Sequence, residues 1–193
     1  MIREEWFPTC IWYENLIADN NYLKKIILNM MKDDKGVKKS NVGGWQSNDI
    51  NKKDFNSLIT IINEKTIQIH KELEYPQNVR LEVSNIWTNV NFPKTVNRMH
   101  DHPLGILSGT YYVQVDNKTG DIEFEDPRRK FRYLESNISK KNRLVWEFVK
   151  YKPKDGLLII FPAWLNHFVE INESINDRIS ISFNIVLVNI DGN

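Results

Sequence analysis

Three of the four histidines have a spacing that could hold a metal ion. His100 and His102 flank Asp101 and precede a β-like run, and His167 follows much later in the chain. In an extended strand, side chains two residues apart project to the same face, so both imidazoles can point at one place while Asp101 points away. A third histidine from a neighbouring strand would complete a facial set with open coordination positions. Imidazole binds Zn, Fe, Cu and Ni, so these residues alone leave the metal open.

A second chemical signal is the strict polar and apolar alternation that begins at Arg178. One face carries Arg178, Ser180, Ser182 and Asn184, and the other carries Ile179, Ile181, Phe183 and Ile185. If the polar face lines the mouth of a barrel, the guanidinium can bind a carboxylate through two parallel hydrogen bonds, with Ser180 or Ser182 adding a hydroxyl donor. A dicarboxylate co-substrate would suit this face. The alternative is a polar face that is exposed to solvent.

Two further segments could contribute polar groups to the same pocket. By strand parity, Tyr112 shares the face from which His100 and His102 project, and its phenol could donate to the far carboxylate of an acid held by Arg178. The alternative is that Tyr112 fills an aromatic site in the sheet. Asn91 and Asn89 share one face of the strand that leads to the histidines. Either amide could hydrogen bond within the pocket or lie at its polar rim.

The elements that must position these residues fall into a helical part and a β part. The N-terminal part predicts an extended segment that suits an edge strand or a packed arm, then two amphipathic helices joined by an ordered connector. Its segments are Trp6–Trp12, a helix from about Asp19 to before Gly36, the connector Ser40–Ser47, and a helix from about Asp49 to before Pro76. From Leu81 onward, short β-like segments alternate with turns, which is typical of a sandwich or barrel. We expect strands near 81–91, 105–115, 121–125, 144–150, 156–161, 167–171 and 178–190.

Length and charge narrow the class of protein. The 193 residues suit one domain, with residues 1–75 as a helical support region and 81–190 as the β core. A net charge of +1 provides no overall field to attract nucleic acid or an anionic membrane. The single cysteine, Cys10, and the lack of a signal-peptide pattern or a membrane-length apolar run lead us to expect a cytoplasmic protein, in the host cytoplasm if it is phage-encoded.

These motifs resemble the Fe(II)/2-oxoglutarate (2OG)-dependent oxygenase superfamily, and most closely a family of small 2OG-Fe(II) oxygenases of bacteria and phages that are similar to prolyl hydroxylases. The likeness spans most of the chain, and Arg178 follows His167 by 11 residues, a spacing typical of such enzymes. The segments that carry the resemblance are Trp6-Phe-Pro-Thr-Cys-Ile-Trp, Asn41-Val-Gly-Gly-Trp-Gln-Ser, His100-Asp-His-Pro, Leu107-Ser-Gly-Thr-Tyr-Tyr-Val, Glu125-Asp-Pro-Arg, Gly156-Leu-Leu-Ile-Ile-Phe-Pro-Ala-Trp-Leu-Asn-His and Arg178-Ile-Ser-Ile-Ser-Phe-Asn.

The resemblance implies a single oxygenase domain with a mainly β fold, a double-stranded β-helix (a cupin-like jelly roll) buttressed by two helices. It also implies Fe(II), 2OG as co-substrate and O2, with His100 and His167 as iron ligands and Arg178 on the 5-carboxylate of 2OG. Tyr112 is similar in position to a co-substrate-binding tyrosine of the related prolyl hydroxylases. The chain departs from the superfamily pattern where His102 stands in place of an Asp or Glu ligand. Strand parity favours His102 over Asp101 as the third ligand.

The reaction that the resemblance implies is hydroxylation, with a peptide or protein side chain as the first substrate hypothesis. Two alternatives remain at the level of sequence. A three-histidine cupin-type dioxygenase or isomerase would share the fold and need no 2OG, but it leaves Arg178 without a role. A non-catalytic ligand-binding jelly roll would have kept only the scaffold. The physiological substrate, the oligomeric state and a lid function for residues 1–75 stay open.

Overall fold

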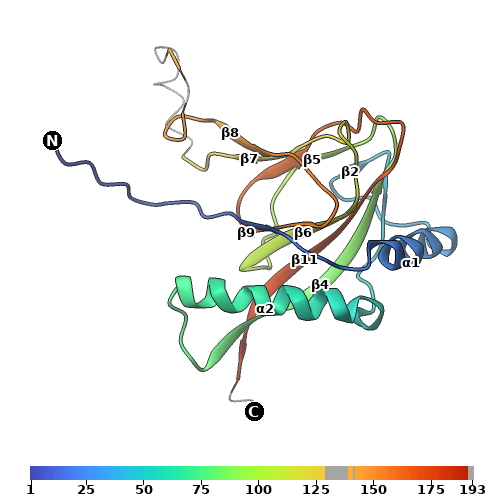
Figure 1. Cartoon of the computed structure of the whole chain (residues 1–193), viewed down its shortest axis with the longest axis horizontal. Coiled ribbons are helices and arrows are strands. Elements are labelled where there is room, and N and C mark those ends of the chain that lie inside the picture. Colours follow the sequence, from blue (N-terminus) through green and yellow to red (C-terminus); the bar gives the residue numbers. More distant parts are fainter. Residues whose placement is uncertain (129–138, 141, 191–193) are drawn as a thin grey trace.

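Two antiparallel β-sheets face each other in the computed structural model, which describes residues 1–128, 139–140 and 142–190 (Figure 1). The larger sheet has six strands, in the order β1 (Trp12–Asn15), β9 (Leu157–Pro162), β6 (Leu107–Gln114), β11 (Arg178–Asn189), β4 (Val79–Asn91) and β3 (Trp45–Gln46). The smaller sheet has five, in the order β2 (Asn41–Val42), β5 (Val96–His100), β10 (His167–Val169), β7 (Ile122–Glu125) and β8 (Phe148–Tyr151). Strands that are distant in sequence are neighbours in both sheets. This architecture confirms the predicted jelly roll.

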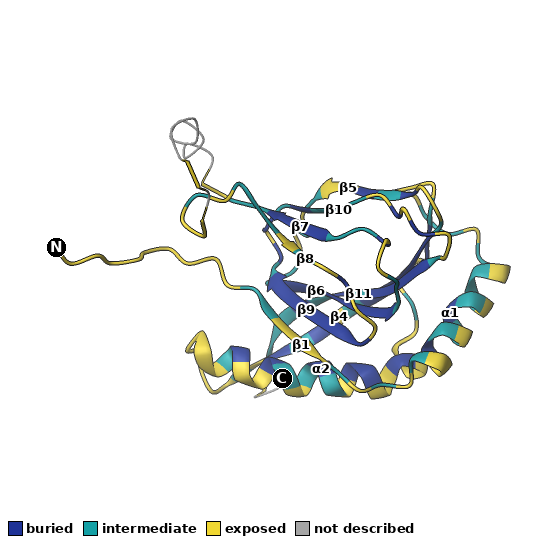
Figure 2. Cartoon of the chain, turned by 45° about the horizontal axis from the view of Figure 1, so that its top comes forward, coloured by how far each residue is buried: buried dark blue, intermediate teal, exposed yellow. Residues whose placement is uncertain are grey.

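Two helices support the larger sheet on the side away from the smaller one (Figure 2). Helix α1 (Asn20–Asp33) begins after Asp19, whose carboxylate accepts a hydrogen bond from the Tyr22 amide as predicted. A short 3₁₀ turn (Lys52–Phe55) leads into α2 (Asn56–Glu72), which lies along β4. No helix within the described residues is long and apolar enough to span a bilayer. Contacts of α2 with β4 and of α1 with β6 hold the helices on the sheet.

The larger sheet is buried on both faces, which explains the continuous apolar runs in its central strands. On the helix side, the apolar residues of β11, including Ile181 and Phe183, form one cluster with Ile27 and Ile62 from the helices. On the inner side, a second cluster lies between the two sheets and includes Ile122, Phe124, Ile159, Phe161 and Leu165. The inner cluster occupies one end of the space between the sheets. Polar residues line the other end, where the candidate site lies.

Several predicted boundaries were wrong for identifiable reasons. The edge strand lies at Trp12–Asn15 and shares only Trp12 with the predicted Trp6–Trp12, because the pairing with β9 begins at Trp12. The second helix begins later than Asp49, since Asn51 provides the cap for the 3₁₀ turn. The strand predicted at 144–150 covers only Phe148–Tyr151. Strands β2, β3 and β5 were not predicted; β2 and β3 are two residues each, and β5 is interrupted by a bulge against β10.

Candidate metal centre

Three histidines converge between the two sheets, as the sequence predicted. His100 is the last residue of β5, His167 is the first residue of β10, and the two lie opposite each other in the antiparallel pair. His102 follows β5 outside any strand and is fixed by a 2.8 Å bond from its amide to the Ala163 carbonyl. One nitrogen from each ring lies within 4.8 Å of the others, a spacing that suits three ligands of one metal ion. Asp101 is exposed and does not belong to this cluster.

Backbone carbonyls orient two of these rings for metal binding. Nδ1 of His100 lies 2.7 Å from the Arg98 carbonyl, and Nδ1 of His167 lies 2.9 Å from the Leu165 carbonyl. Because a carbonyl only accepts, each Nδ1 carries the proton and each Nε2 keeps its lone pair free. Ligating histidines are commonly held in this way by a second hydrogen bond. The third ring, His102, packs beside Trp87 with ring centroids 5.5 Å apart.

Burial keeps the histidines neutral, which is the form that binds a metal. It lowers the pKa of His167 to about 3 and the pKa of His102 to about 4, and proximity to His100 adds to both decreases. Burial also lowers the pKa of His100. No proton must leave an imidazole before a divalent ion binds at neutral pH. The chemistry of the donor set therefore fits Fe(II), although three imidazoles would also accept other divalent ions.

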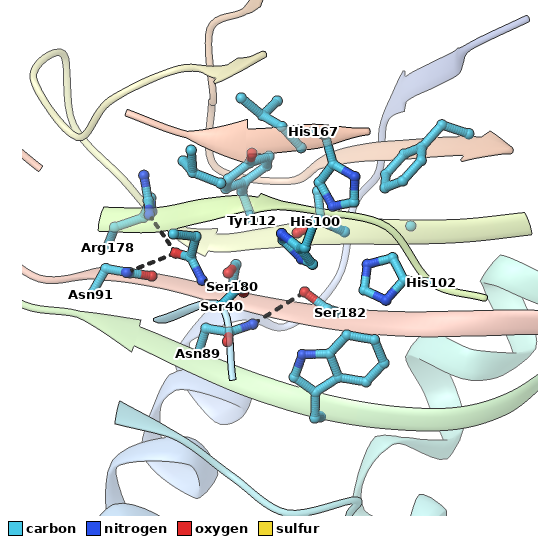
Figure 3. Close-up of a pocket in the computed structure, with 17 residues that line it drawn as sticks. Ser40, Asn89, Asn91, His100, His102, Tyr112, His167, Arg178, Ser180 and Ser182 are labelled. Carbon is cyan, nitrogen blue, oxygen red and sulfur yellow. Dashed lines mark hydrogen bonds between the residues drawn. The ribbon is translucent and has the colours of Figure 1, made fainter. Parts of the chain in front are cut away.

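Arg178 lies in the same cavity as the histidines, with its side chain 1% exposed (Figure 3). Its Nη1 donates to the Thr119 carbonyl at 2.7 Å and its Nη2 to Asn97 Oδ1 at 3.3 Å. In the part of the chain that the structure describes, no carboxylate forms an ion pair with this guanidinium. Burial lowers its pKa to about 10, so the group is still cationic at pH 7. A buried cation without a counter-ion is costly, and an anionic ligand would relieve that cost.

Strand pairing arranges the polar groups of the cavity floor in rows. In one row, Ser180 of β11 lies between Asn89 of β4 and Tyr112 of β6; in the next, Ser182 lies between Trp87 and Thr110. Burial raises the pKa of Tyr112 to about 12, so its phenol is a neutral donor. Among the described residues, neither the Tyr112 nor the Ser180 hydroxyl has a hydrogen-bond partner. Two free hydroxyls and a guanidinium at one end of the cavity are complementary to a carboxylate.

Sequence reasoning missed Asn97, a polar residue that lines the cavity and contacts Arg178. Asn97 of β5 uses Oδ1 to accept from both Arg178 and Asn91, and its Nδ2 donates to Ser40 at 3.3 Å. Asn91 thus lines the cavity as predicted, but its amide nitrogen is bound to Asn97 at 2.9 Å. Asn184 of the predicted polar face lies outside the cavity and donates to Asn85. Asn97 holds the guanidinium in place from the opposite sheet.

Comparison with known proteins agrees with this geometry. Residues 85–184 match the model of a family described as "Putative 2OG-Fe(II) oxygenase". No curated protein matches. The described fold is also similar to those of solved structures, three of which are given below. Their sequence identity to this chain is only 10–12%, so the similarity concerns the fold alone.

The first solved structure is a 2OG-Fe(II) oxygenase family oxidoreductase from Burkholderia pseudomallei, with TM-score 0.53, 11% identity, 71% of this chain covered and 59% of that chain. The second is the non-haem α-ketoglutarate-dependent epimerase SnoN from nogalamycin biosynthesis, with TM-score 0.69, 10% identity and coverage of 94% and 79%. The third is a prolyl hydroxylase from Trichoplax adhaerens in complex with a hypoxia inducible factor peptide fragment, with TM-score 0.64, 12% identity and coverage of 91% and 83%.

The family match covers more than half of the chain, and it includes His100, His102, His167 and Arg178. The cofactor and substrates that such enzymes share are Fe(II), 2OG and O2, and the three-histidine cluster and the cavity with its unpaired cation agree with them. The chain belongs to the 2OG-Fe(II) oxygenase family and is a 2OG-dependent Fe(II) oxygenase.

Proposed function

We propose that this oxygenase binds Fe(II) through His100, His102 and His167, binds 2OG between that metal and Arg178, and hydroxylates a peptide or protein side chain. The observation that carries the proposal is the buried, unpaired guanidinium of Arg178 in the cavity that also contains the three imidazoles. A three-histidine cupin enzyme that needs no 2OG would leave this cation without an anion. A non-catalytic jelly roll would give no reason for three histidines to converge.

The end of the cavity at Arg178 supplies donors for the 5-carboxylate of 2OG. Arg178 provides the charge, while Tyr112 and Ser180 provide neutral hydroxyls from the neighbouring strand and from β11 itself. Charge-assisted hydrogen bonds of this kind are about twice as strong as neutral ones. Because Thr119 and Asn97 already fix the guanidinium, little side-chain freedom is lost when the carboxylate binds. Arg178 is therefore organised for an anion before 2OG arrives.

At the other end of the cavity, the proposed metal ligands lie beside aromatic rings, Trp87 next to His102 and Phe161 next to His167. When bound, Fe(II) and 2OG together supply the oxidising chemistry that activates O2. The chain orients the co-substrate, keeps the imidazoles neutral and surrounds the metal with Phe161 and Trp87, which limit access of bulk water. Because His102 stands where the superfamily has a carboxylate, the three protein ligands bring no negative charge. No Asp or Glu lines the described cavity either.

The proposed hydroxylation can be tested by mass spectrometry. The Fe(II)-loaded enzyme is incubated aerobically with a synthetic library of proline-, asparagine- and lysine-containing peptides, with and without 2OG. We expect some peptides to gain one oxygen atom only when 2OG is present, with formation of an equal amount of succinate. Arg178→Gln serves as the matched control, and its yield should fall sharply at low 2OG concentration. Succinate formation without any oxidised peptide across the library would overturn the peptide assignment and leave the oxygenase assignment intact.

A further inference from the structure

One polar atom in the cavity is buried without a partner. Three side-chain atoms of the described residues are buried and lack a hydrogen bond: Thr88 Oγ1, Asn184 Oδ1 and Asn89 Oδ1. Of the three residues, only Asn89 lines the cavity, where its side chain projects from β4 (Figure 3). Asn89 is 6% exposed, so bulk water does not compensate this carbonyl. Burial of an unpaired acceptor is unfavourable, and a ligand that donates a proton to it would recover that cost.

The other half of the Asn89 amide fixes the position of a hydroxyl. Nδ2 of Asn89 donates to Ser182 Oγ at 3.1 Å, and the Ser182 hydroxyl donates to no described residue. With Oγ engaged as an acceptor, its proton is free to point into the cavity. The two side chains thus present an acceptor, Asn89 Oδ1, next to a donor, the Ser182 hydroxyl. An amide group has the complementary pair, an N–H beside a carbonyl.

The co-substrate cannot satisfy this pair. At neutral pH, 2OG has two carboxylates and a ketone, and all of these groups are acceptors. It can therefore receive hydrogen bonds from Arg178, Tyr112 and Ser180, but it has no proton to donate to Asn89 Oδ1. A donor for this carbonyl therefore has to come from something other than 2OG.

The pair also lies toward the metal and away from the Arg178 end of the cavity. Ser182 is four residues beyond Arg178 along β11, a distance of roughly 13 Å in an extended strand. Its partner across the ladder is Trp87, whose ring lies 5.5 Å from that of His102. A substrate held here would therefore be close to the metal ligands.

We propose that Asn89 and Ser182 form a subsite that binds an amide group of the primary substrate, with its N–H on Asn89 Oδ1 and its carbonyl on the Ser182 hydroxyl. This assignment rests on the proposed function, because it places the amide next to a metal-bound co-substrate. It requires a hydroxylated substrate with an amide close to the oxidised carbon, as in a peptide backbone or a carboxamide side chain.

The test uses paramagnetic relaxation with two probes of nearly equal shape. The full chain is loaded with Mn(II) and 2OG under argon, and the relaxation rate of the methyl protons of N-methylacetamide is compared with that of methyl acetate, which lacks the N–H. One net hydrogen bond of about 1 kcal/mol corresponds to roughly fivefold in affinity. We expect the relaxation enhancement of the amide to exceed that of the ester about fivefold. Asn89→Ala should abolish this preference, while Asn85→Ala, on the same strand but outside the cavity, should retain it.

Further measurements test whether Asn89 and Ser182 bind the amide of the substrate. Ser182→Ala should weaken the enhancement of both probes, because both contain a carbonyl. Equal enhancement of amide and ester in the wild type, or a preference that survives Asn89→Ala, would overturn the subsite. A 2OG dissociation constant raised about tenfold by Asn89→Ala would also overturn it, since it would place the amide on the co-substrate. Failure of the proposed function has a separate signature, because the protons of 2OG itself would then show no Mn(II)-dependent relaxation.

Discussion

His167 of β10 lies directly opposite His100 of β5, with ring centroids 4.3 Å apart, although 66 residues separate them in the chain. Two of the three proposed ligands are therefore fixed by one antiparallel strand pair. The third, His102, lies on the segment after β5 and is held by its backbone bond to Ala163. The positions of the first two rings depend on the sheet, whereas the position of the third depends on the backbone bond to Ala163 and on packing beside Trp87.

The ligand set can be tested by comparing two neighbouring substitutions. His102→Ala should lower the affinity for Fe(II) by more than tenfold, because loss of even a group that supports a ligand costs about 10–100-fold. Asp101→Ala should leave the affinity within about twofold of the wild type, since Asp101 is exposed and outside the cluster. Anaerobic competition with a chromophoric chelator measures both. A larger loss in Asp101→Ala would show that the carboxylate is the ligand.

Asn97→Asp should weaken 2OG binding although Asn97 is not proposed to contact 2OG. The new carboxylate would lie at the position of Oδ1, 3.3 Å from Arg178 Nη2, and would pair with the guanidinium in place of the co-substrate. We expect the dissociation constant of 2OG to rise at least tenfold, with little change in Fe(II) affinity. Calorimetric titration of the Zn(II)-loaded protein with 2OG measures the 2OG dissociation constant. Unchanged 2OG affinity in this variant would contradict the role given to Arg178.

Gly109→Ala tests the packing behind the cavity. A methyl group at Gly109 would lie 2.4 Å from a ring carbon of Phe183 and 2.7 Å from the Ile159 carbonyl. Overpacking of this kind typically costs about 1–3 kcal/mol. For a chain of this length, the melting temperature should fall by roughly 2–4 °C per kcal/mol. Thermal unfolding followed by circular dichroism measures the change, and a melting temperature equal to that of the wild type would show that the sheet adjusts freely.

The stability of the metal-free protein should decrease as pH falls below about 6.5. The pKa of His167 is about 3 in the folded protein, below its ordinary value near 6.5, so the unfolded chain binds the proton more readily. The contribution of neutral His167 to the free energy of unfolding is complete above pH 6.5 and is progressively lost toward pH 3. In EDTA, the urea midpoint of the wild type should fall more steeply from pH 7 to pH 4.5 than that of His167→Asn. Parallel slopes would refute this contribution.

The sequence contained enough information for the fold class and for most of the cavity floor. The alternation from Arg178 to Ser182 in β11 is strict because the apolar face enters the core while the polar face lines the cavity. Helix α1 was also predictable, since the Asp19 cap and the apolar stripe are local signals. Such features depend on residues that are close together in the chain, so they can be predicted from the sequence.

Asn97 could not be predicted in the same way. Between Val169 and His167, β10 advances two residues while β5 advances three, from Asn97 to His100. This bulge brings an odd-numbered and an even-numbered residue of β5 to the same cavity, which strand parity forbids. The unpaired carbonyl of Asn89 was equally hidden, because hydrogen bonding depends on partners from β11. Irregular pairing and long-range contacts are the parts that only the structure provides.

Anaerobic titration of the Fe(II)-loaded protein with 2OG shows directly whether 2OG binds between the metal and Arg178. Chelation of ferrous iron by the keto acid produces a weak visible charge-transfer band. We expect the band in the wild type and in the surface control Arg80→Gln, and we expect Arg178→Gln to require at least tenfold more 2OG, because it removes the only cation that lines the described cavity. Bound iron without a band in the wild type, or an Arg178→Gln variant that titrates like the wild type, would contradict binding of 2OG between the metal and Arg178.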